Sequence, residues 1–258
     1  MLKIASIGDC CVDVYPKEKK YFLGGTAFNR AVYLAKNGTQ TSLVSAVGTD
    51  NWGQKYLAAC KKLKINTDYL TVLPGTTSHV NITLNQNQQP DFSAWDLGVL
   101  KNFAPTLPKN QDAVIATYLK PIKPLATLPS GPFRVVDFCG GSIYSPQLSI
   151  IKQLLPRLDL VVRSAAAVEL PALKQLAKSS NKIVLVTLGK NGSILFSGQK
   201  EYHQPAISAK TSDTTGAGDV YISSFVLNYL KTKNIPQSMR LAAQAAAAAI
   251  TSPRNLTV

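Results

Sequence analysis

The order of short apolar runs and amphipathic stretches is the feature that most constrains how this chain folds. Runs rich in Val, Ile and Leu alternate with stretches whose apolar residues recur at helical spacing. The strand-like runs are 3–7, 41–47, 112–116, 133–138, 158–162 and 182–187, and the helix-like stretches are 27–36, 53–64, 146–155, 171–178, 216–230 and 237–250. Apolar strands separated by helices predict right-handed βαβ units, so we expect an α/β fold with a mostly parallel central sheet flanked by helices.

One segment breaks this alternation. Between residues 68 and 92 strand follows strand, with runs at 69–73 and 76–84, a polar turn and a short return. Together with residues 10–22 this segment predicts a small second sheet, either a flap over a substrate or a solvated hairpin. No long linker or internal repeat divides the chain, so we expect residues 1–258 to form a single domain.

Composition argues against several classes of protein. No charge-depleted run approaches the roughly 20 residues that span a membrane, so we expect no membrane partner. The four cysteines form no CxxC and no cluster with the two histidines, which indicates reduced thiols in a cytoplasmic protein. The net charge of +14 would suit a nucleic-acid binder, but the basic residues are dispersed and no nucleic-acid motif is present. We therefore expect no nucleic-acid partner.

The sequence DTTGAGD at 213–219 carries the clearest chemical signal. Small residues in a tight turn expose backbone N–H groups where a helix begins, and that geometry favours an anion. Asp219 at the same helix start would compete with a bound phosphate, unless its carboxylate accepts a proton from a hydroxyl that attacks the phosphate. The residues alone leave open the alternative that Asp219 merely caps the helix.

Two other phosphate-binding patterns are missing from the sequence. No GxxxxGK[ST] is present, which argues against a P-loop nucleotidase. No GxGxxG follows the first strand, where a dinucleotide-binding fold would place it.

Four motifs in sequence order resemble those of the ribokinase-like (PfkB) carbohydrate kinases. They are Gly8-Asp9 with Asp13, GGTAFNRA at 24–31 with the later Gly38 and Gly48, VTLGKNG at 186–192, and DTTGAGD at 213–219. The resemblance covers nearly the whole chain and implies a ribokinase-like fold with a lid formed by about 10–22 and 76–92. It also implies a sugar kinase that uses ATP and Mg²⁺, and a homodimer formed through the lid.

The resemblance also implies roles for individual residues. The implied site residues are the catalytic base Asp219 with the amides of Gly216, Ala217 and Gly218, the sugar-binding Asp13, Gly25 and Asn29, and the nucleotide-bordering Thr187, Gly189 and Gly192. Without the resemblance, simpler structural roles are also open. Asp13 could be a carboxylate in a turn and Asn29 an amide on a helix face. Thr187 could simply end a strand, and Gly189 and Gly192 could be ordinary turn glycines. In the lid, His79, Asn81 and Trp95 are candidates to face the sugar, beside an ordinary packing role.

The chain departs from the family at one motif. Many members carry Asn-x-x-Glu after the strand at 158–162, where it helps to order Mg²⁺ and its waters. This chain has Ser164 and Ala167 at those positions, with Glu169 two residues late. We expect Asp137, at the end of its strand, or Glu169 to take the metal-linked role. Glu169 equally suits an ordinary carboxylate in the first turn of the next helix.

Residues 7–16 and 24–33 resemble the fructoselysine 6-kinases more than ribokinase. That resemblance implies a fructosamine substrate, a sugar amine-linked to an amino acid, phosphorylated on its 6-hydroxyl. Two alternatives stay open. One is a kinase for a simple sugar such as fructose or ribose. The other is a non-catalytic ligand-binding relative, which the altered metal motif would allow.

Overall fold

The computed structural model describes residues 1–86, 88–120, 128, 131–140, 145–211 and 213–251. These residues form a nine-stranded main sheet of order β13-β12-β11-β10-β9-β8-β1-β4-β5. Its parallel strands are β1 (Lys3–Ile7), β4 (Gln40–Gly48), β5 (Leu70–Leu73), β8 (Ala113–Thr117), β9 (Phe133–Asp137), β10 (Leu160–Ser164) and β11 (Ile183–Thr187). Short Val- and Ile-rich strands, buried on both faces in the middle of the sheet, explain this arrangement, and the predicted α/β class is confirmed.

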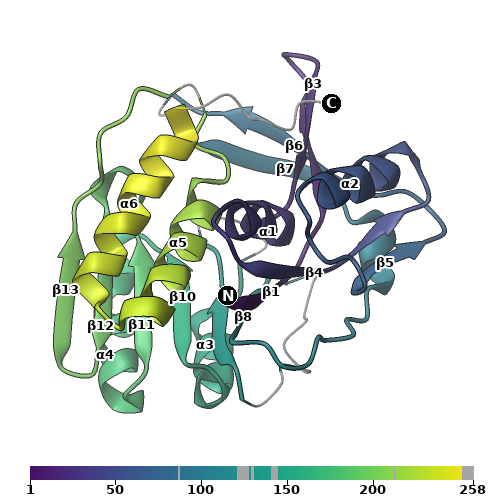
Figure 1. The fold of residues 1–258 in the computed structure, drawn as a ribbon. Coiled ribbons are helices and arrows are strands. Elements are labelled where there is room, and N and C mark those ends of the chain that lie inside the picture. Colours follow the sequence, from purple (N-terminus) through teal and green to yellow (C-terminus); the bar gives the residue numbers. More distant parts are fainter. Residues whose placement is uncertain (87, 121–127, 129–130, 141–144, 212, 252–258) are drawn as a thin grey trace.

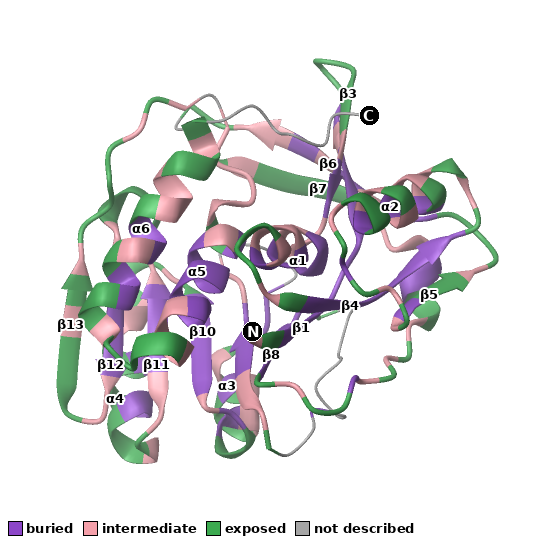
Figure 2. Cartoon of the chain, in the orientation of Figure 1, coloured by how far each residue is buried: buried purple, intermediate pink, exposed green. Residues whose placement is uncertain are grey.

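Helices cover both faces of the main sheet. On one face lie α3 (Leu148–Leu154) and α4 (Leu170–Ser180), and on the other lie α1 (Thr26–Lys36), α5 (Ala217–Thr232) and α6 (Ile235–Thr251). Helix α2 (Asn51–Lys62) packs beside α1 and β4 in a third apolar cluster. The shorter 3₁₀ turns are Gly98–Asn102, Leu155–Arg157, Ala167–Glu169 and Gly189–Asn191. In Figure 2 the purple, buried residues follow the central strands and the sheet-facing side of α5.

A second, four-stranded sheet lies beyond α1 (Figure 1). Its strands are β2 (Cys11–Tyr15), β3 (Lys20–Gly24), β6 (Ser78–Leu84) and β7 (Pro90–Asp96), in the order β3-β2-β6-β7. The β2–β3 and β6–β7 pairs are antiparallel hairpins, and a parallel β2–β6 pair joins them. The predicted small sheet is therefore present, although β7 extends beyond residue 92. Asn87, in the predicted polar turn, lies outside the described residues.

Two strand assignments differ from the sequence-based expectation. The run at 69–73, expected near the small sheet, forms β5 and pairs with β4 in the main sheet. Leu70 explains this placement, because its buried side chain packs with Leu43 and Val47. Strands β12 (Ser193–Ser197) and β13 (Lys200–Gln204) were not predicted, and they add an antiparallel hairpin at the far edge. Strand β13 is mostly exposed (Figure 2), so it lacks the continuous apolar run that marks the buried strands.

Parallel pairing brings several polar residues to one edge of the main sheet. Asp9 follows β1 by two residues, and Thr117, Asp137, Ser164 and Thr187 end the strands β8, β9, β10 and β11. In open parallel sheets ligands bind outside the carboxyl ends of the strands. The fold therefore gathers hydrogen-bonding groups at this edge. No helix in the described residues is long and apolar enough to span a membrane.

Candidate active site

A cavity of about 160 Å³ lies between the small sheet and this edge of the main sheet. Its lining comes from both parts of the molecule: Cys11, Asp13, Val80, Phe92 and Trp95 from the small sheet, and Asp9, Gly25, Thr26, Asn29, Leu119, Cys139, Gly140, Thr215, Gly216 and Asp219 from the main body. The small-sheet side of the cavity is therefore mostly apolar and aromatic, with Asp13 as its carboxylate, and the main-body side carries Asp9, Asp219 and the start of a helix. That combination suits a small polar ligand that must be oriented.

Asp219 lies in the first turn of α5 and lines the cavity. The helix begins after Gly216, whose φ of +82° puts the chain in the left-handed region that glycine tolerates best. The N–H groups of Gly218 and Asp219 have no hydrogen-bond acceptor among the described residues, as is usual in the first turn of a helix. Gly218 is exposed, with open space where a side chain would lie. This helix start therefore presents free donors to an anion beside a carboxylate.

Two neighbours on α1 fix the Asp219 carboxylate. Asn29 donates from Nδ2 to Oδ2 of Asp219 at 2.9 Å, and Arg30 Nε lies 3.2 Å from its Oδ1. Burial raises the pKa of Asp219 to about 7, although Arg30 and the Asn29 hydrogen bond act in the opposite direction. A carboxylate with such a pKa is partly ionised at neutral pH, a property that suits a general base, and the catalytic role of Asp219 stays a prediction.

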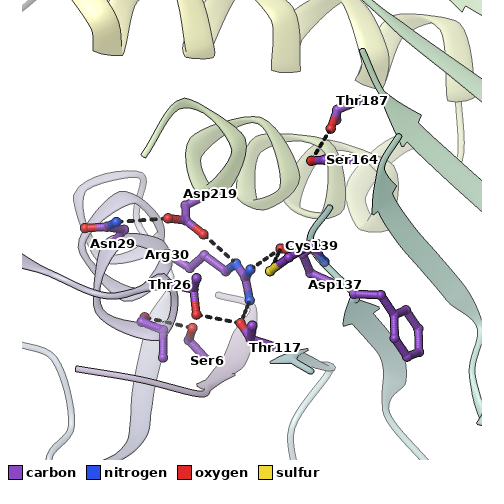
Figure 3. A network of polar contacts seen from close by, with 12 residues as sticks. Ser6, Thr26, Asn29, Arg30, Thr117, Asp137, Cys139, Ser164, Thr187 and Asp219 are labelled. Atoms are coloured by element: carbon purple, nitrogen blue, oxygen red, sulfur yellow. Dashed lines mark hydrogen bonds and ion pairs between the residues drawn. The ribbon is translucent and has the colours of Figure 1, made fainter. Parts of the chain in front are cut away.

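Arg30 is the centre of the polar network and was given no role by the sequence analysis. Its side chain is completely buried. The guanidinium donates to Oγ1 of Thr117 at 2.7 Å and to Oδ2 of Asp137 at 2.6 Å, in addition to its ion pair with Asp219. Figure 3 shows this guanidinium between the ends of β8 and β9 and the start of α5. An arginine on the buried face of a predicted helix was the available signal, because a buried arginine is almost always paired.

The first turn of α1 is built around Asp9. Its Oδ1 accepts hydrogen bonds from the backbone N–H and the hydroxyl of Thr26, and Thr26 in turn contacts Thr117. Gly25, with φ of +91°, precedes this turn, and a Cβ there would lie 2.5 Å from the Asp9 carbonyl oxygen. Glycine is required at this position because any side chain would prevent the close approach of these two backbone segments. Gly25 also lines the cavity. Asp9 belongs to the motif of Gly8-Asp9 with Asp13, and no individual role for it was predicted.

The Asp13 carboxylate is held within the small sheet at the cavity wall. Asp13 lies on β2 opposite Phe22 and is buried. A side chain at Gly24 would come within 2.4 Å of the Asp13 carboxylate, so the second glycine of the pair leaves the space that this carboxylate fills. The predicted sugar-binding residues Asp13, Gly25 and Asn29 therefore line one cavity together with Asp219.

The predicted phosphate-facing amides are not equivalent. Gly216 lines the cavity and Gly218 is open to solvent. Ala217 differs from the prediction, because its N–H donates to the carbonyl oxygen of Thr214 at 3.1 Å and closes the turn. The turn therefore leaves the amides of Gly218 and Asp219, rather than that of Ala217, available to an anion.

The predicted nucleotide residues lie at the ends of β10 and β11 and in the turn that follows. The Thr187 hydroxyl is 2.8 Å from that of Ser164 on the neighbouring strand (Figure 3). Ser164 is exposed and Thr187 is half-buried. Gly189 and Gly192 both have positive φ in the turn between β11 and β12. A Cβ on Gly192 would lie 2.2 Å from the Gln204 carbonyl oxygen, so close packing against β13 already requires glycine there. None of the three predicted residues lines the cavity.

The two carboxylates expected to serve a metal are each paired with an arginine. Asp137 accepts from Arg30 and from the backbone N–H of Cys139, and Glu169 accepts from Arg163 at 3.0 Å and from the Ala166 N–H. Neither lines the cavity. Among the described residues, no three His, Cys, Asp or Glu side chains cluster closely enough to hold a metal ion. The pair therefore does not form a ready metal site in this arrangement.

The small sheet places one of its three candidate residues at the cavity. Trp95 lines the cavity and donates from Nε1 to the Ser78 hydroxyl at 2.9 Å. Along β6 it is Val80, rather than His79 or Asn81, that lines the cavity. Successive side chains of a strand point to opposite faces, so Val80 can face inward only if its two neighbours face away.

The sequence is similar to known carbohydrate kinases over most of its length. The sequence matches the pfkB family of carbohydrate kinases over residues 1–118 and 149–256. It is 30% identical over 253 residues to fructoselysine 6-kinase of Shigella flexneri, covering 93% of this chain and 94% of that protein. It is 26% identical over 258 residues to fructosamine kinase FrlD of Bacillus subtilis, covering 95% and 90% respectively.

A solved structure shows the same fold. The nucleoside kinase of Methanocaldococcus jannaschii, described as an archaeal member of the ribokinase family, superposes with a TM-score of 0.80 at 20% identity, covering 100% of this chain and 95% of the other. The chain therefore belongs to the pfkB family of carbohydrate kinases. It is an ATP-dependent carbohydrate kinase with a ribokinase-like fold.

Proposed function

We propose that this kinase transfers the γ-phosphoryl group of ATP to the 6-hydroxyl of a fructosamine such as fructoselysine, with Asp219 as the base. The hydroxyl oxygen bonds to the γ-phosphorus, the bond from that phosphorus to the β–γ bridging oxygen breaks, and ADP leaves. The hydroxyl proton passes to the Asp219 carboxylate. General-base assistance of this kind contributes about 10²- to 10⁴-fold in rate, and positioning and charge neutralisation supply the rest.

The observation that carries the proposal is the acidic cavity floor beside the start of α5. Asp219 has a pKa of about 7 and lies beside free helix amides, where a hydroxyl and a phosphoryl group would meet. Asp9 and Asp13 also line this cavity, and the described lining contains no lysine or arginine. A cavity with this charge favours a substrate with a protonated amine over a neutral sugar. The two relatives named for fructoselysine and fructosamine support the same substrate class.

Asp13, Gly25 and Asn29 are the proposed sugar-binding residues. Asp13 offers carboxylate oxygens to sugar hydroxyls, and the backbone at Gly25 allows a ligand to approach closely. Asn29 already donates to Asp219, so we expect it both to contact the sugar and to orient the base. Together these groups would hold the accepting hydroxyl near Asp219, which is the positioning that phosphoryl transfer needs.

The nucleotide is proposed to lie near Thr187, Gly189 and Gly192, with its γ-phosphate toward the free amides of Gly218 and Asp219. Mg²⁺ bound to the ATP phosphates would neutralise charge on the phosphoryl oxygens. Asp137 and Glu169 are engaged by arginines in this structure, so their metal-linked role stays a prediction. Closure of the small sheet over the sugar as a lid, and a homodimer through that sheet, also stay predictions.

A substrate panel with coupled detection of ADP tests the proposal. It compares fructoselysine with fructose, ribose and nucleosides, each with ATP and Mg²⁺. Fructoselysine and fructose share the sugar and differ in the amine-linked amino acid, so their ratio of kcat/KM measures the effect of that whole substituent. We expect fructoselysine to be preferred and Asp13→Asn to reduce that preference. A higher kcat/KM for a neutral sugar would reject the fructosamine assignment while leaving the kinase assignment in place.

A further inference from the structure

Tyr15, at the end of β2 in the small sheet, contacts the loop that precedes the catalytic helix. Its hydroxyl donates to Oδ2 of Asp213 at 2.6 Å and lies 3.1 Å from the Thr215 hydroxyl. Asp213 in turn accepts from the backbone N–H and the hydroxyl of Thr215 through its Oδ1. Thr215 and the adjacent Gly216 line the cavity. One side chain of the small sheet is thus linked, through Asp213 and Thr215, to the turn that begins α5.

The hairpin between β6 and β7 contacts the same loop from a second direction. The carbonyl oxygen of Gln88 accepts from the backbone N–H of Thr214 at 3.1 Å and from its hydroxyl at 3.0 Å. The Thr214 carbonyl oxygen then accepts from Ala217 in the first turn of the helix. One strand and one turn of the small sheet, through Tyr15 and Gln88, therefore contact three consecutive residues of this loop, Asp213, Thr214 and Thr215.

We infer that Tyr15 is a positioning residue that ties the small sheet to the phosphate-binding turn, so that the position of the sheet sets the geometry of Thr215 and Gly216. The inference rests on the proposed function for its catalytic meaning. Tyr15 itself does not line the cavity, so it acts through Asp213 and Thr215 rather than by touching the substrate. The consequence is that a sugar held under the small sheet and a phosphate at the start of α5 are aligned through one hydrogen-bonded loop.

Tyr15→Phe tests this link with little disturbance elsewhere. Tyr15 is buried and packs edge-on against Phe22 with ring centroids 5.5 Å apart, and phenylalanine keeps that ring contact. The substitution removes the hydroxyl contacts with Asp213 and Thr215. Tyr21→Phe is the matched control, because Tyr21 lies on the adjacent strand in register with Val14, is exposed, and contacts Trp52 through its ring.

Two measurements separate a positioning role from a structural one. Hydrogen–deuterium exchange of the ligand-free protein needs no activity, and we expect Tyr15→Phe to raise amide exchange within 213–219 by about threefold or more while other segments keep their rates. In steady-state kinetics we expect kcat to fall about tenfold while KM for the sugar changes less than about twofold, because alignment rather than sugar contact is lost. Tyr21→Phe should leave exchange and kinetics unchanged.

The exchange measurement tests the role of Tyr15 independently of whether the protein phosphorylates a fructosamine. Unchanged exchange within 213–219 in Tyr15→Phe overturns the inference, even if kcat falls. Faster exchange across the whole chain also overturns it, because the hydroxyl would then serve general stability. If the wild-type protein phosphorylates no sugar, the proposed function fails, and the exchange comparison still decides whether Tyr15 holds the loop.

Discussion

Two arginine–carboxylate clusters stand at the carboxyl ends of neighbouring strands, and they are built differently. Arg30 is completely buried and pairs with Asp137 and Asp219, which come from the end of β9 and the start of α5. Arg163 keeps 10% of its side chain exposed and pairs with Glu169, six residues later in the chain and 33% exposed. The first cluster joins three elements that are distant in sequence, whereas the second fixes a local turn.

The two clusters differ in how strongly their charges depend on one another. The Arg30 cluster carries one positive and two negative charges in a buried setting, so each charge depends strongly on the others. The Arg163 cluster is partly solvated, and its arginine also donates to the carbonyl oxygens of Phe138 and Pro146. We therefore expect substitutions in the first cluster to change catalysis and those in the second to change local stability.

Removal of divalent metal is expected to have the greatest effect on turnover, and it tests whether either cluster takes part in binding a metal ion. EDTA should abolish turnover and Mg²⁺ should restore it, because phosphoryl transfer needs charge neutralised on the phosphate oxygens. Asp137→Ala should weaken the response to Mg²⁺ more than Glu169→Ala does, as measured by Mg²⁺ titration of kcat. Full activity in chelator would contradict the Mg²⁺ requirement, and the reverse order of the two variants would move the metal-linked role to the Arg163 cluster.

Asp219→Asn should lower kcat by about 10²-fold or more at every pH near neutrality, because an amide cannot accept the hydroxyl proton. Affinities for ATP and sugar should change little. The variant keeps the shape of the side chain and leaves Arg30 paired with Asp137. Asp159→Asn is the matched control, since Asp159 pairs with Arg134 and does not line the cavity. Turnover within a few-fold of wild type would remove Asp219 as the base.

The same variant has a stability signature that a helix-cap role would not give. The pKa of Asp219 in the folded state, about 7, lies above its ordinary value of 3.8 because burial disfavours the charged form. Its contribution to stability is therefore complete below about pH 4 and is lost as the pH rises through 7. The Tm of Asp219→Asn relative to wild type should rise across that window and then level off. A Tm below that of wild type throughout would instead support the helix-cap interpretation.

Arg30→Gln and Arg163→Gln compare the two clusters directly. Removing Arg30 leaves Asp137 and Asp219 buried without their cation, so the pKa of Asp219 should rise further and the acid limb of the pH–rate profile should move to higher pH. Turnover at neutral pH should fall about tenfold or more and recover partly in alkali. Arg163→Gln should keep the wild-type profile. If Arg30→Gln fails to fold, Arg30→Lys keeps the charge without the planar fork, and its acid limb should stay near wild type. Equal pH–rate profiles for Arg30→Gln and Arg163→Gln would show that the two clusters do not differ in their effect on Asp219.

The smallest expected effect concerns the small sheet. If it closes over the sugar, sugar binding should slow amide exchange within 76–92, as measured by hydrogen–deuterium exchange with and without the substrate found in the panel. Helix α6 lies against α5 on the outer side of the molecule and serves as the internal reference (Figure 1). Protection confined to other segments would show that this hairpin takes no part in closure.

The sequence predicted most of the fold because its signals are local. Val- and Ile-rich runs gave β1, β4, β8, β9, β10 and β11 within a few residues, and the helical periodicity gave α1 to α6 in the same way. The weakly patterned β13 was missed, because half-exposed edge strands carry no continuous apolar run. The run at 69–73 was recognised as a strand, but its sheet was decided by where Leu70 packs.

The candidate site likewise contains residues that local motifs indicate and contacts between residues that are distant in sequence. The residues themselves indicated Asp219 and the glycine turn, because a helix start with exposed amides requires particular residues within a few positions. The predicted roles of Asp13, Gly25 and Asn29 came instead from the resemblance of short motifs to those of the carbohydrate kinases. The contacts of Arg30 with Asp137 and of Tyr15 with Asp213 span 107 and 198 residues. Such contacts depend on strand register, helix placement and rotamers that no local pattern encodes. Local patterns along the chain thus locate the residues that end strands and begin helices. Which of those residues pair depends on the folded arrangement, because buried charges are neutralised by neighbours in space and not by neighbours in sequence.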